Sequence, residues 1–246
     1  MARYKVILAY DGTDFFGMQR QAQARTVQGA FEDALRKIGW QGRSILAAGR
    51  TDAGVHASGQ VAAFDLDWSH SEDELLKAIN ANLPADAAVQ RVSRTSADFH
   101  PRFDALSRRY RYRIYCRSDR DPLLDRHAWR VWPEPDVDHM QAAAQRFVGE
   151  HDFSAFGTPP DEGGPTIRNV IAAGWHQKED LLSFEIEANA FLYHMVRRIV
   201  QFLVQVGQGK SAVDELETLL SGQVSEMVRG LAPAKGLELV EVRFVE

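Results

Sequence analysis

Residues 44–65, Ser-Ile-Leu-Ala-Ala-Gly-Arg-Thr-Asp-Ala-Gly-Val-His-Ala-Ser-Gly-Gln-Val-Ala-Ala-Phe-Asp, decide the fold because they hold two strand-like runs joined by a turn. The runs cover 44–48 and 60–65. The octapeptide between them, residues 49–56, contains a single carboxylate, Asp52. A turn between strands directs a side chain away from its own backbone, where it can meet a substrate. Asp-Ala-Gly is also ordinary turn sequence, so the octapeptide alone leaves a structural and a catalytic role open.

The flanking sequence predicts a strand, a helix, a helix and a strand around this pair. Residues 4–10 alternate as a strand does, and Thr26 is placed to cap a helix over 27–38. Ser71 and Glu74 form a capping-box pattern ahead of a second helix that stops before Pro84. A last strand is expected over 88–94. The order β-α-β-β-α-β is that of a split βαβ unit.

The second half of the chain predicts a similar series without repeating residues. The expected elements are strands over 109–115, 167–175, 181–187 and 237–245, and helices over 138–148, 190–206 and 213–220. The prediction is therefore an α+β fold of two ferredoxin-like split βαβ subdomains, residues 1–104 and 105–246. We expect their antiparallel sheets to merge and the active-site cleft to lie between them.

Composition excludes several classes of protein. The chain has 246 residues, 45% of them hydrophobic, which is enough for a sizeable core. The single cysteine, Cys116, excludes an intrachain disulfide and a cysteine-rich zinc site. The N-terminus runs into a strand pattern without a secretory signal, and polar residues interrupt the apolar segment 190–206, so we expect a cytoplasmic protein that spans no membrane. No metal spacing or phosphate-binding glycine loop is recognisable.

Charge is unevenly distributed along the chain. The formal net charge is −5, yet residues 100–130 contain nine arginines against four aspartates. Arginine suits bidentate phosphate contacts and stacking on bases. A salt-bridged surface remains an equal alternative.

Aromatic residues accompany these arginines in two segments. In the expected strand 109–115, alternation places Tyr110 and Tyr112 on one face and the arginines on the other, with Tyr112 expected in the core. A loop holds the second group of candidate RNA-binding residues, which are Phe99, His100, Pro101, Arg102 and Phe103. Exposed aromatic residues in a loop can stack on bases.

Arg197 lies beside the apolar stripe of the expected helix 190–206. A partly buried arginine needs an anionic partner, and Asp52 is a suitable one. Such a pair would keep the aspartate ionised and oriented as a nucleophile requires. Asp11 and Asp14 are interpreted as turn residues, because too few oxygen ligands follow them for a cation site.

With these segments in view, the chain resembles the tRNA pseudouridine synthase A family nearly end to end. The resemblance rests on six segments: Tyr10-Asp11-Gly12-Thr13 through Gly17, the octapeptide 49–56, Arg109-Tyr110-Arg111-Tyr112, His151-Asp152-Phe153 with Phe156, residues 191–197, and Ala232-Pro233 with Gly236-Leu237. Three positions depart from the family pattern: Met18 replaces tryptophan, Arg198 asparagine and Gln201 glycine.

The resemblance implies isomerisation of uridine to pseudouridine at positions 38, 39 and 40 of the tRNA anticodon stem-loop. It implies a homodimer that uses no metal or cofactor. Asp52 matches the catalytic aspartate, Tyr110 the tyrosine that packs on the target uracil, Arg50 the arginine linked to base flipping and Arg197 the arginine that pairs with the aspartate. Residues 99–103 match a tRNA-contacting loop, and Arg109 and Arg111 are expected to bind RNA.

Two other functions remain possible at this stage. A non-catalytic RNA-binding module would use the arginine and aromatic segments alone. A glycosidase would need a second carboxylate beside Asp52, and no such partner stands out. For the isomerase, the sequence leaves open whether Asp52 attacks C1′ of the ribose or C6 of the uracil.

Overall fold

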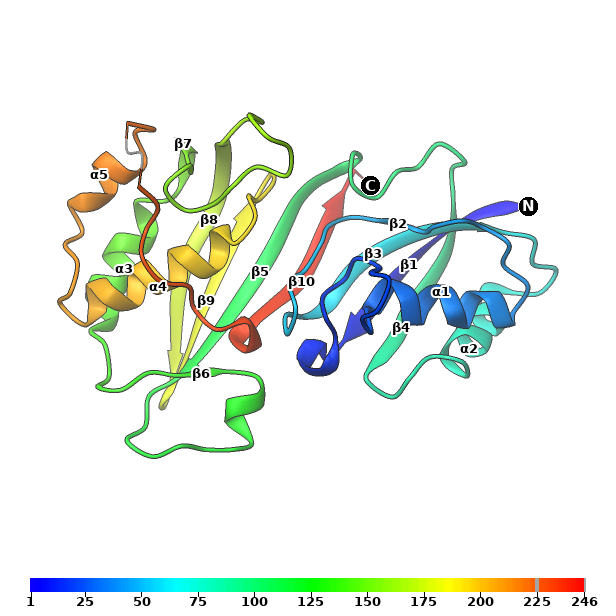
Figure 1. Ribbon diagram of the computed structural model, residues 1–246, viewed down its shortest axis with the longest axis horizontal. Coiled ribbons are helices and arrows are strands. Elements are labelled where there is room, and N and C mark those ends of the chain that lie inside the picture. Colours follow the sequence, from blue (N-terminus) through cyan, green and yellow to red (C-terminus); the bar gives the residue numbers. More distant parts are fainter. Residues whose placement is uncertain (224–225, 246) are drawn as a thin grey trace. The chain divides into compact units, whose positions relative to one another are not determined.

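The computed structural model describes residues 1–223 and 226–245 of this chain. It is a mixed α/β structure whose strands pair mostly in antiparallel fashion. Contacts divide the chain into two compact units. The first is Met1–Leu106 together with the C-terminal residues from Glu238, and the second is Ser107–Leu237. Figure 1 draws the elements in sequence order from blue to red.

The first unit is a sheet with two helices. Its elements are β1 (Ala2–Tyr10), the short 3-10 helix η1 (Gly12–Asp14), α1 (Val27–Lys37), β2 (Leu46–Ala47), β3 (His56–Leu66), α2 (Glu72–Asn80), β4 (Ala87–Thr95) and β10 (Leu237–Phe244). Strand β1 pairs antiparallel with β3 on one side and with β4 on the other. Strand β3 also pairs with β2, antiparallel, and with β10, parallel.

Local sequence explains these elements. Strand β1 buries every second residue, Tyr4, Val6, Leu8 and Tyr10. Helix α1 begins where Thr26 Oγ1 accepts a hydrogen bond from an N–H of the first turn, and α2 begins at a complete capping box. The Phe31 ring of α1 lies against Phe64 of β3, with ring centroids 5.8 Å apart. This contact joins the helix to the sheet.

Four strands of the second unit are neighbours in the order β5-β9-β8-β7. Its elements are β5 (Ala105–Tyr115), η2 (Leu124–Arg126), β6 (Trp129–Arg130), α3 (Val137–Gln145), β7 (Gly149–Asp152), β8 (Ile167–Lys178), β9 (Leu181–Ala188), α4 (Met195–Gly207), α5 (Glu215–Leu219) and η3 (Ala234–Gly236). The pairs β5–β9, β8–β9 and β7–β8 are antiparallel, while β6 pairs in parallel with β5.

An aromatic cluster forms much of the core of this unit. Phe147, Phe153 and Phe156 contact one another, and Phe156 reaches Phe202 of α4 with ring centroids 6.1 Å apart. All four rings are buried. The apolar stripe of α4 is therefore a core face.

The predicted order of elements is confirmed, while several boundaries were wrong. The helix expected from Ala190 begins at Met195, because Tyr193 forms an isolated antiparallel bridge with Thr158 and His194 adopts a left-handed φ of 66°. The strand expected over 44–48 is reduced to two residues, and β6 and β7 were not anticipated. A distant partner therefore decides where α4 starts.

Three larger expectations on architecture have different outcomes. A mixed fold with a mainly antiparallel sheet is confirmed. The assignment of two ferredoxin-like subdomains with merged sheets and a cleft between them stays a prediction. The predicted subdomains, residues 1–104 and 105–246, stay a prediction. By contacts, the residues from Glu238 belong with the first unit, in which β10 pairs with β3.

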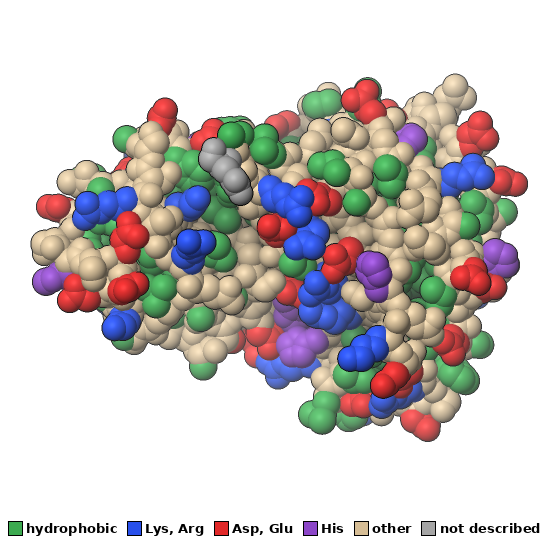
Figure 2. All heavy atoms as spheres, turned by 180° about the vertical axis from the view of Figure 1, so that it is seen from behind, with side chains coloured by type: hydrophobic (Ala, Val, Ile, Leu, Met, Phe, Trp, Pro, Cys, Tyr) green, Lys and Arg blue, Asp and Glu red, His purple; other side chains and the backbone are tan. Residues whose placement is uncertain are grey.

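The surface carries charges of both signs. On the face shown in Figure 2, acidic side chains lie among the basic ones, in keeping with the small net charge of −5. Among the described residues, no helix has the length and apolar character needed to cross a membrane.

Candidate active site

The Asp52 turn connects the segment after β2 to the start of β3. Asp52 itself is half-buried. Its backbone carbonyl accepts a hydrogen bond from Val55 N–H at 3.1 Å, and Gly54 takes a φ of +79°, a conformation that suits glycine. The predicted turn is confirmed.

A second segment, residues 12–18, lies directly against this turn. Met18 N–H donates to Thr51 O at 3.0 Å, and Gly54 N–H donates to Phe15 O at 3.3 Å. The approach is closest at Gly12, where a Cβ atom would stand 2.0 Å from Val55 O. Backbone packed on backbone at this distance leaves room for glycine alone.

Buried side chains hold the turn from the other side. The hydroxyls of Tyr10 and Thr51 lie 2.8 Å apart, and Gln60 Nε2 donates to Gly49 O at 3.1 Å. Tyr10, Thr51 and Gln60 are all buried. Burial raises the pKa of Tyr10 to about 12, so its hydroxyl remains a neutral hydrogen-bonding group. Asp52 thus sits on a backbone that is fixed by groups on both sides.

Arg50 and Asp52 flank buried Thr51 in the chain. Arg50 is exposed and Asp52 is half-buried. A carboxylate on a rigid turn can act as a nucleophile or a base, and an exposed guanidinium beside it can contact phosphate or a base. The octapeptide therefore presents one reactive group and one cation.

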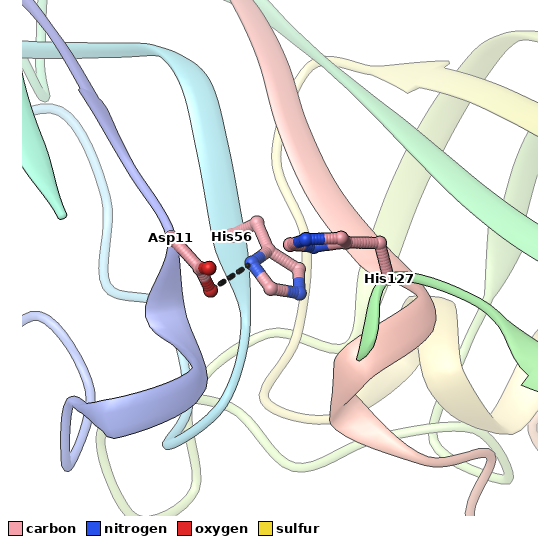
Figure 3. Close-up of side chains that lie close together, drawn as sticks. All are labelled: Asp11, His56 and His127. Atoms are coloured by element: carbon pink, nitrogen blue, oxygen red, sulfur yellow. Dashed lines mark ion pairs between the residues drawn. The ribbon is translucent and has the colours of Figure 1, made fainter. Parts of the chain in front are cut away.

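The η1 segment adds a histidine contact to the end of this turn. His56 Nδ1 accepts a hydrogen bond from Gly12 N–H at 3.1 Å and lies 3.2 Å from Asp11 Oδ1. Figure 3 shows the Asp11 carboxylate directed at this side of the His56 ring. Asp11 Oδ1 also accepts hydrogen bonds from the backbone N–H and the hydroxyl of Thr13. Asp11 is a turn residue, as predicted.

The predicted RNA-binding loop 99–103 belongs to the same unit. The Phe99 ring lies 5.2 Å from that of Phe244, and Lys5 Nζ lies over both rings. Pro101 is buried, whereas Phe103 is 74% exposed and contacts His100 at 4.3 Å. The exposed guanidinium of Arg102 lies 5.7 Å from the Phe103 ring. The loop thus holds an aromatic group and a cation at the surface on an anchored base.

Tyr110 and its neighbouring arginines belong to β5 of the second unit. Tyr110 is half-buried and packs edge-on against Phe191, with ring centroids 5.0 Å apart. Arg109 and Arg111 both reach Glu185 of β9, at 3.5 Å and 2.7 Å. The predicted alternation of tyrosine and arginine along this strand is borne out by the pairing of β5 with β9.

Tyr112 is fully buried, as expected, and supports another motif of the chain. Its hydroxyl donates to Pro233 O at 2.7 Å, and a Cβ at Gly236 would stand 2.6 Å from the Tyr112 ring. Burial holds the pKa of Tyr112 far above its usual value. The Ala232-Pro233 and Gly236 segment is therefore packed on this tyrosine.

Arg197 lies near the start of α4 and is half-buried. Its Nε donates to Ala232 O at 2.8 Å. The neighbouring Arg198 donates to Phe156 O at 3.4 Å, and burial followed by the charge of Arg197 lowers the pKa of Arg198. The predicted pairing of Arg197 with Asp52 joins residues of different units and stays a prediction.

Comparison with known proteins identifies the family. The sequence profile of the family described as "tRNA pseudouridine synthase" matches residues 6–104 and 143–245. A tRNA pseudouridine synthase A from Limosilactobacillus fermentum is 39% identical over 99% of this chain and 96% of its own length. The chain belongs to the tRNA pseudouridine synthase A family. It is therefore an isomerase, and the expectation drawn from the six segments is confirmed.

Other members of the tRNA pseudouridine synthase A family match to the same extent. The protein of that name from Geobacter sp. strain M21 is 39% identical, and the alignment covers all of both chains. Among solved structures, a chain of the crystal structure of a Cbf5-Nop10-Gar1 complex gives a TM-score of 0.37 at 13% identity, covering 82% of this chain and 45% of that one.

The three departures from the family pattern are accommodated by packing. Met18 is 1% exposed and fills an interior position. Arg198 bonds the Phe156 carbonyl, and Gln201 lies against Gly230, where a Cβ would stand 3.1 Å from its amide carbon. All three side chains are thus explained within their own units, without reference to a substrate.

The contacts of two buried residues in the first unit were missed in the sequence. His56 contacts Gly12 and Asp11, as described above. Glu32 of α1 is completely buried and accepts hydrogen bonds from Arg20 at 2.5 Å and from the backbone N–H of Ile45 at 3.2 Å. For Glu32, the sequence offered one signal, a charged residue on the apolar face of the expected helix. The same pattern is equally typical of a surface position.

Proposed function

We propose that this isomerase converts uridine to pseudouridine in tRNA, at positions 38, 39 and 40 of the anticodon stem-loop, with Asp52 as the nucleophile. The observation that carries the proposal is the match to tRNA pseudouridine synthase A proteins over 99% or more of the chain. Asp52 lies within the matched range 6–104, on a turn whose backbone is fixed on both sides. A rigid support is what a nucleophile needs in order to meet its target in a reactive geometry.

The reaction requires few chemical groups. The N1–C1′ bond of the target uridine breaks, the uracil rotates and a C5–C1′ bond forms. C5 then loses its hydrogen as a proton and N1 takes up a proton, so that the product is an isomer of uridine. Asp52 supplies a carboxylate that adds to C1′ of the ribose or to C6 of the uracil and is released again at the end. The ring must be held and water excluded while it is detached.

The other residues have roles that follow from the same chemistry. A base within a stem must be extruded before it can react, and Arg50 is proposed to support that step. Tyr110 is proposed to pack on the extruded uracil and Arg197 to pair with Asp52.

RNA binding is assigned to the exposed basic and aromatic groups. Residues 99–103 are proposed to contact the tRNA through Phe103 and Arg102, the most exposed side chains of that loop. Arg109 and Arg111 are proposed as further contacts. We also propose a homodimer in the cytoplasm; sedimentation at micromolar concentration tests the dimer.

Tritium release tests the reaction directly. With tRNA transcripts carrying 5-tritiated uridine at position 38, 39 or 40 singly, we expect release from each, and none when cytidine occupies all three. Binding without release would indicate a non-catalytic RNA-binding module. Free uracil in the products would indicate a glycosidase. Release from uridines elsewhere in the tRNA would contradict the assigned positions.

A further inference from the structure

Three hydrogen bonds join residues 12–18 to the Asp52 turn, one at each end and one between. Met18 N–H binds Thr51 O before Asp52, Gly54 N–H binds Phe15 O after it, and Gly12 N–H binds the His56 ring at the far end. The first two bonds use backbone groups only. The third is the one that depends on a side chain.

His56 is well placed to fix this end of the turn. His56 is 6% exposed and is the first residue of strand β3. Its backbone is paired with Glu238 of β10, which fixes it in the sheet. At the same end, Gly12 lies so close that a Cβ would stand 2.0 Å from Val55 O. The imidazole thus gives Gly12 N–H an acceptor at the point of closest approach between the two segments.

Nδ1 of His56 has two close neighbours. It accepts a hydrogen bond from Gly12 N–H at 3.1 Å and lies 3.2 Å from Asp11 Oδ1. The Asp11 carboxylate oxygen near Nδ1 is itself bonded twice by Thr13. The η1 segment is therefore shaped by its own turn and joined to β3 through His56 (Figure 3).

We propose that His56 is a positioning residue for the Asp52 turn, acting through the hydrogen bond from Gly12 N–H to Nδ1. The proposal rests on the function proposed for Asp52. Loss of the contact releases one of the three ties between the segments, and the Asp52 carboxylate moves away from its reactive position. A displacement near 1 Å lowers turnover by about 100-fold.

Three substitutions at one position test the role of Nδ1. The amide oxygen of Asn reaches close to the place of Nδ1 and can accept from Gly12 N–H, whereas the amide of Gln reaches the place of Nε2. We expect kcat within about 3-fold of wild type for His56→Asn and a fall of about 10- to 100-fold for His56→Gln and His56→Ala. KM for tRNA should change by less than about 3-fold in all three variants. The exposed His70 gives the matched control, His70→Ala.

Amide hydrogen exchange at Gly12 gives a second readout that needs no activity. We expect protection of Gly12 N–H in the wild type and in His56→Asn, and faster exchange in His56→Ala. Full turnover in His56→Ala, or equal loss in the Asn and Ala variants, would overturn the proposal. If exchange behaves as expected while the wild type releases no tritium, the contact stands and the proposed function fails. If His56→Ala or His56→Gln does not fold, the test rests on His56→Asn alone. That variant must then keep both the protection of Gly12 N–H and the turnover of the wild type.

Discussion

The substitution Gly12→Ala tests how tightly the site depends on the approach of residues 12–18 to the Asp52 turn. The added Cβ would stand 2.0 Å from Val55 O, and Cβ contacts in proteins are essentially never under 3.0 Å. The two backbone segments must therefore separate by at least about 1 Å, since both partners are backbone atoms. We expect kcat to fall by about 100-fold and the free energy of unfolding to fall by about 1–3 kcal/mol.

The control for this substitution comes from the octapeptide itself. A Cβ at Gly49 would meet nothing within 4 Å, so Gly49→Ala should retain kcat and stability. The assay is single-turnover tritium release with saturating enzyme, combined with urea unfolding of each variant. A Gly12→Ala protein with kcat within a factor of about two of wild type would refute the reasoning, because the Asp52 geometry would then tolerate the displacement.

Three further outcomes follow from the described contacts. Glu32→Ala removes the buried carboxylate that accepts hydrogen bonds from the Arg20 guanidinium and the Ile45 backbone N–H. We expect urea unfolding to show that the free energy of unfolding falls by about 2–4 kcal/mol. A fall of less than about 0.5 kcal/mol would contradict the interpretation. Burial raises the pKa of Tyr10 from 10.0 to about 12. The unfolded chain therefore loses this proton at lower pH than the folded one, and stability that is complete below pH 10 declines as the pH rises towards 12. Between pH 9 and pH 11, Tyr10→Phe should lose about 1 kcal/mol less of its unfolding free energy than wild type; parallel losses would contradict this. Glu185→Gln removes the carboxylate that pairs with Arg109 and Arg111, so tRNA affinity should rise at low salt and its dependence on salt should steepen. Unchanged salt slopes in filter-binding titrations would show that these arginines do not reach phosphate.

Features set by neighbouring residues were predictable from the sequence. The caps at Thr26 and Ser71 need only groups within three residues, and both are present. The alternation of β1 follows from its own residue types, and so does the turn at Asp52. Local hydrogen bonding and strand periodicity decide such features, whatever the rest of the chain does.

Features that depend on distant partners were not predictable. The start of α4 shifts by five residues because Tyr193 bridges to Thr158. The final strand belongs to the first unit, where it pairs with β3 (His56–Leu66), a strand far earlier in the chain. The hydrophobic periodicity of residues 190–206 and of the final strand does not indicate either contact.

In the candidate site too, features set by local sequence were predictable and features set by distant partners were not. Asp52 was identified by its place in an uncommon octapeptide, and Tyr112 was correctly expected in the core. The part played by His56 depends on Gly12, 44 residues away, and that of Glu32 depends on Arg20 and Ile45. Those roles became visible once the fold brought the partners together.

The most direct test of the account is the activity of Asp52→Asn. The amide keeps the size of the side chain and removes the carboxylate that the proposed reaction needs. Asp14→Asn, at an exposed aspartate of the same unit, provides the control. We expect Asp52→Asn to lose more than about 1,000-fold in tritium release from anticodon-arm uridines, with tRNA affinity retained and Asp14→Asn fully active. An Asp52→Asn protein that releases tritium within about tenfold of the wild-type rate would contradict the central claim that this carboxylate is the nucleophile.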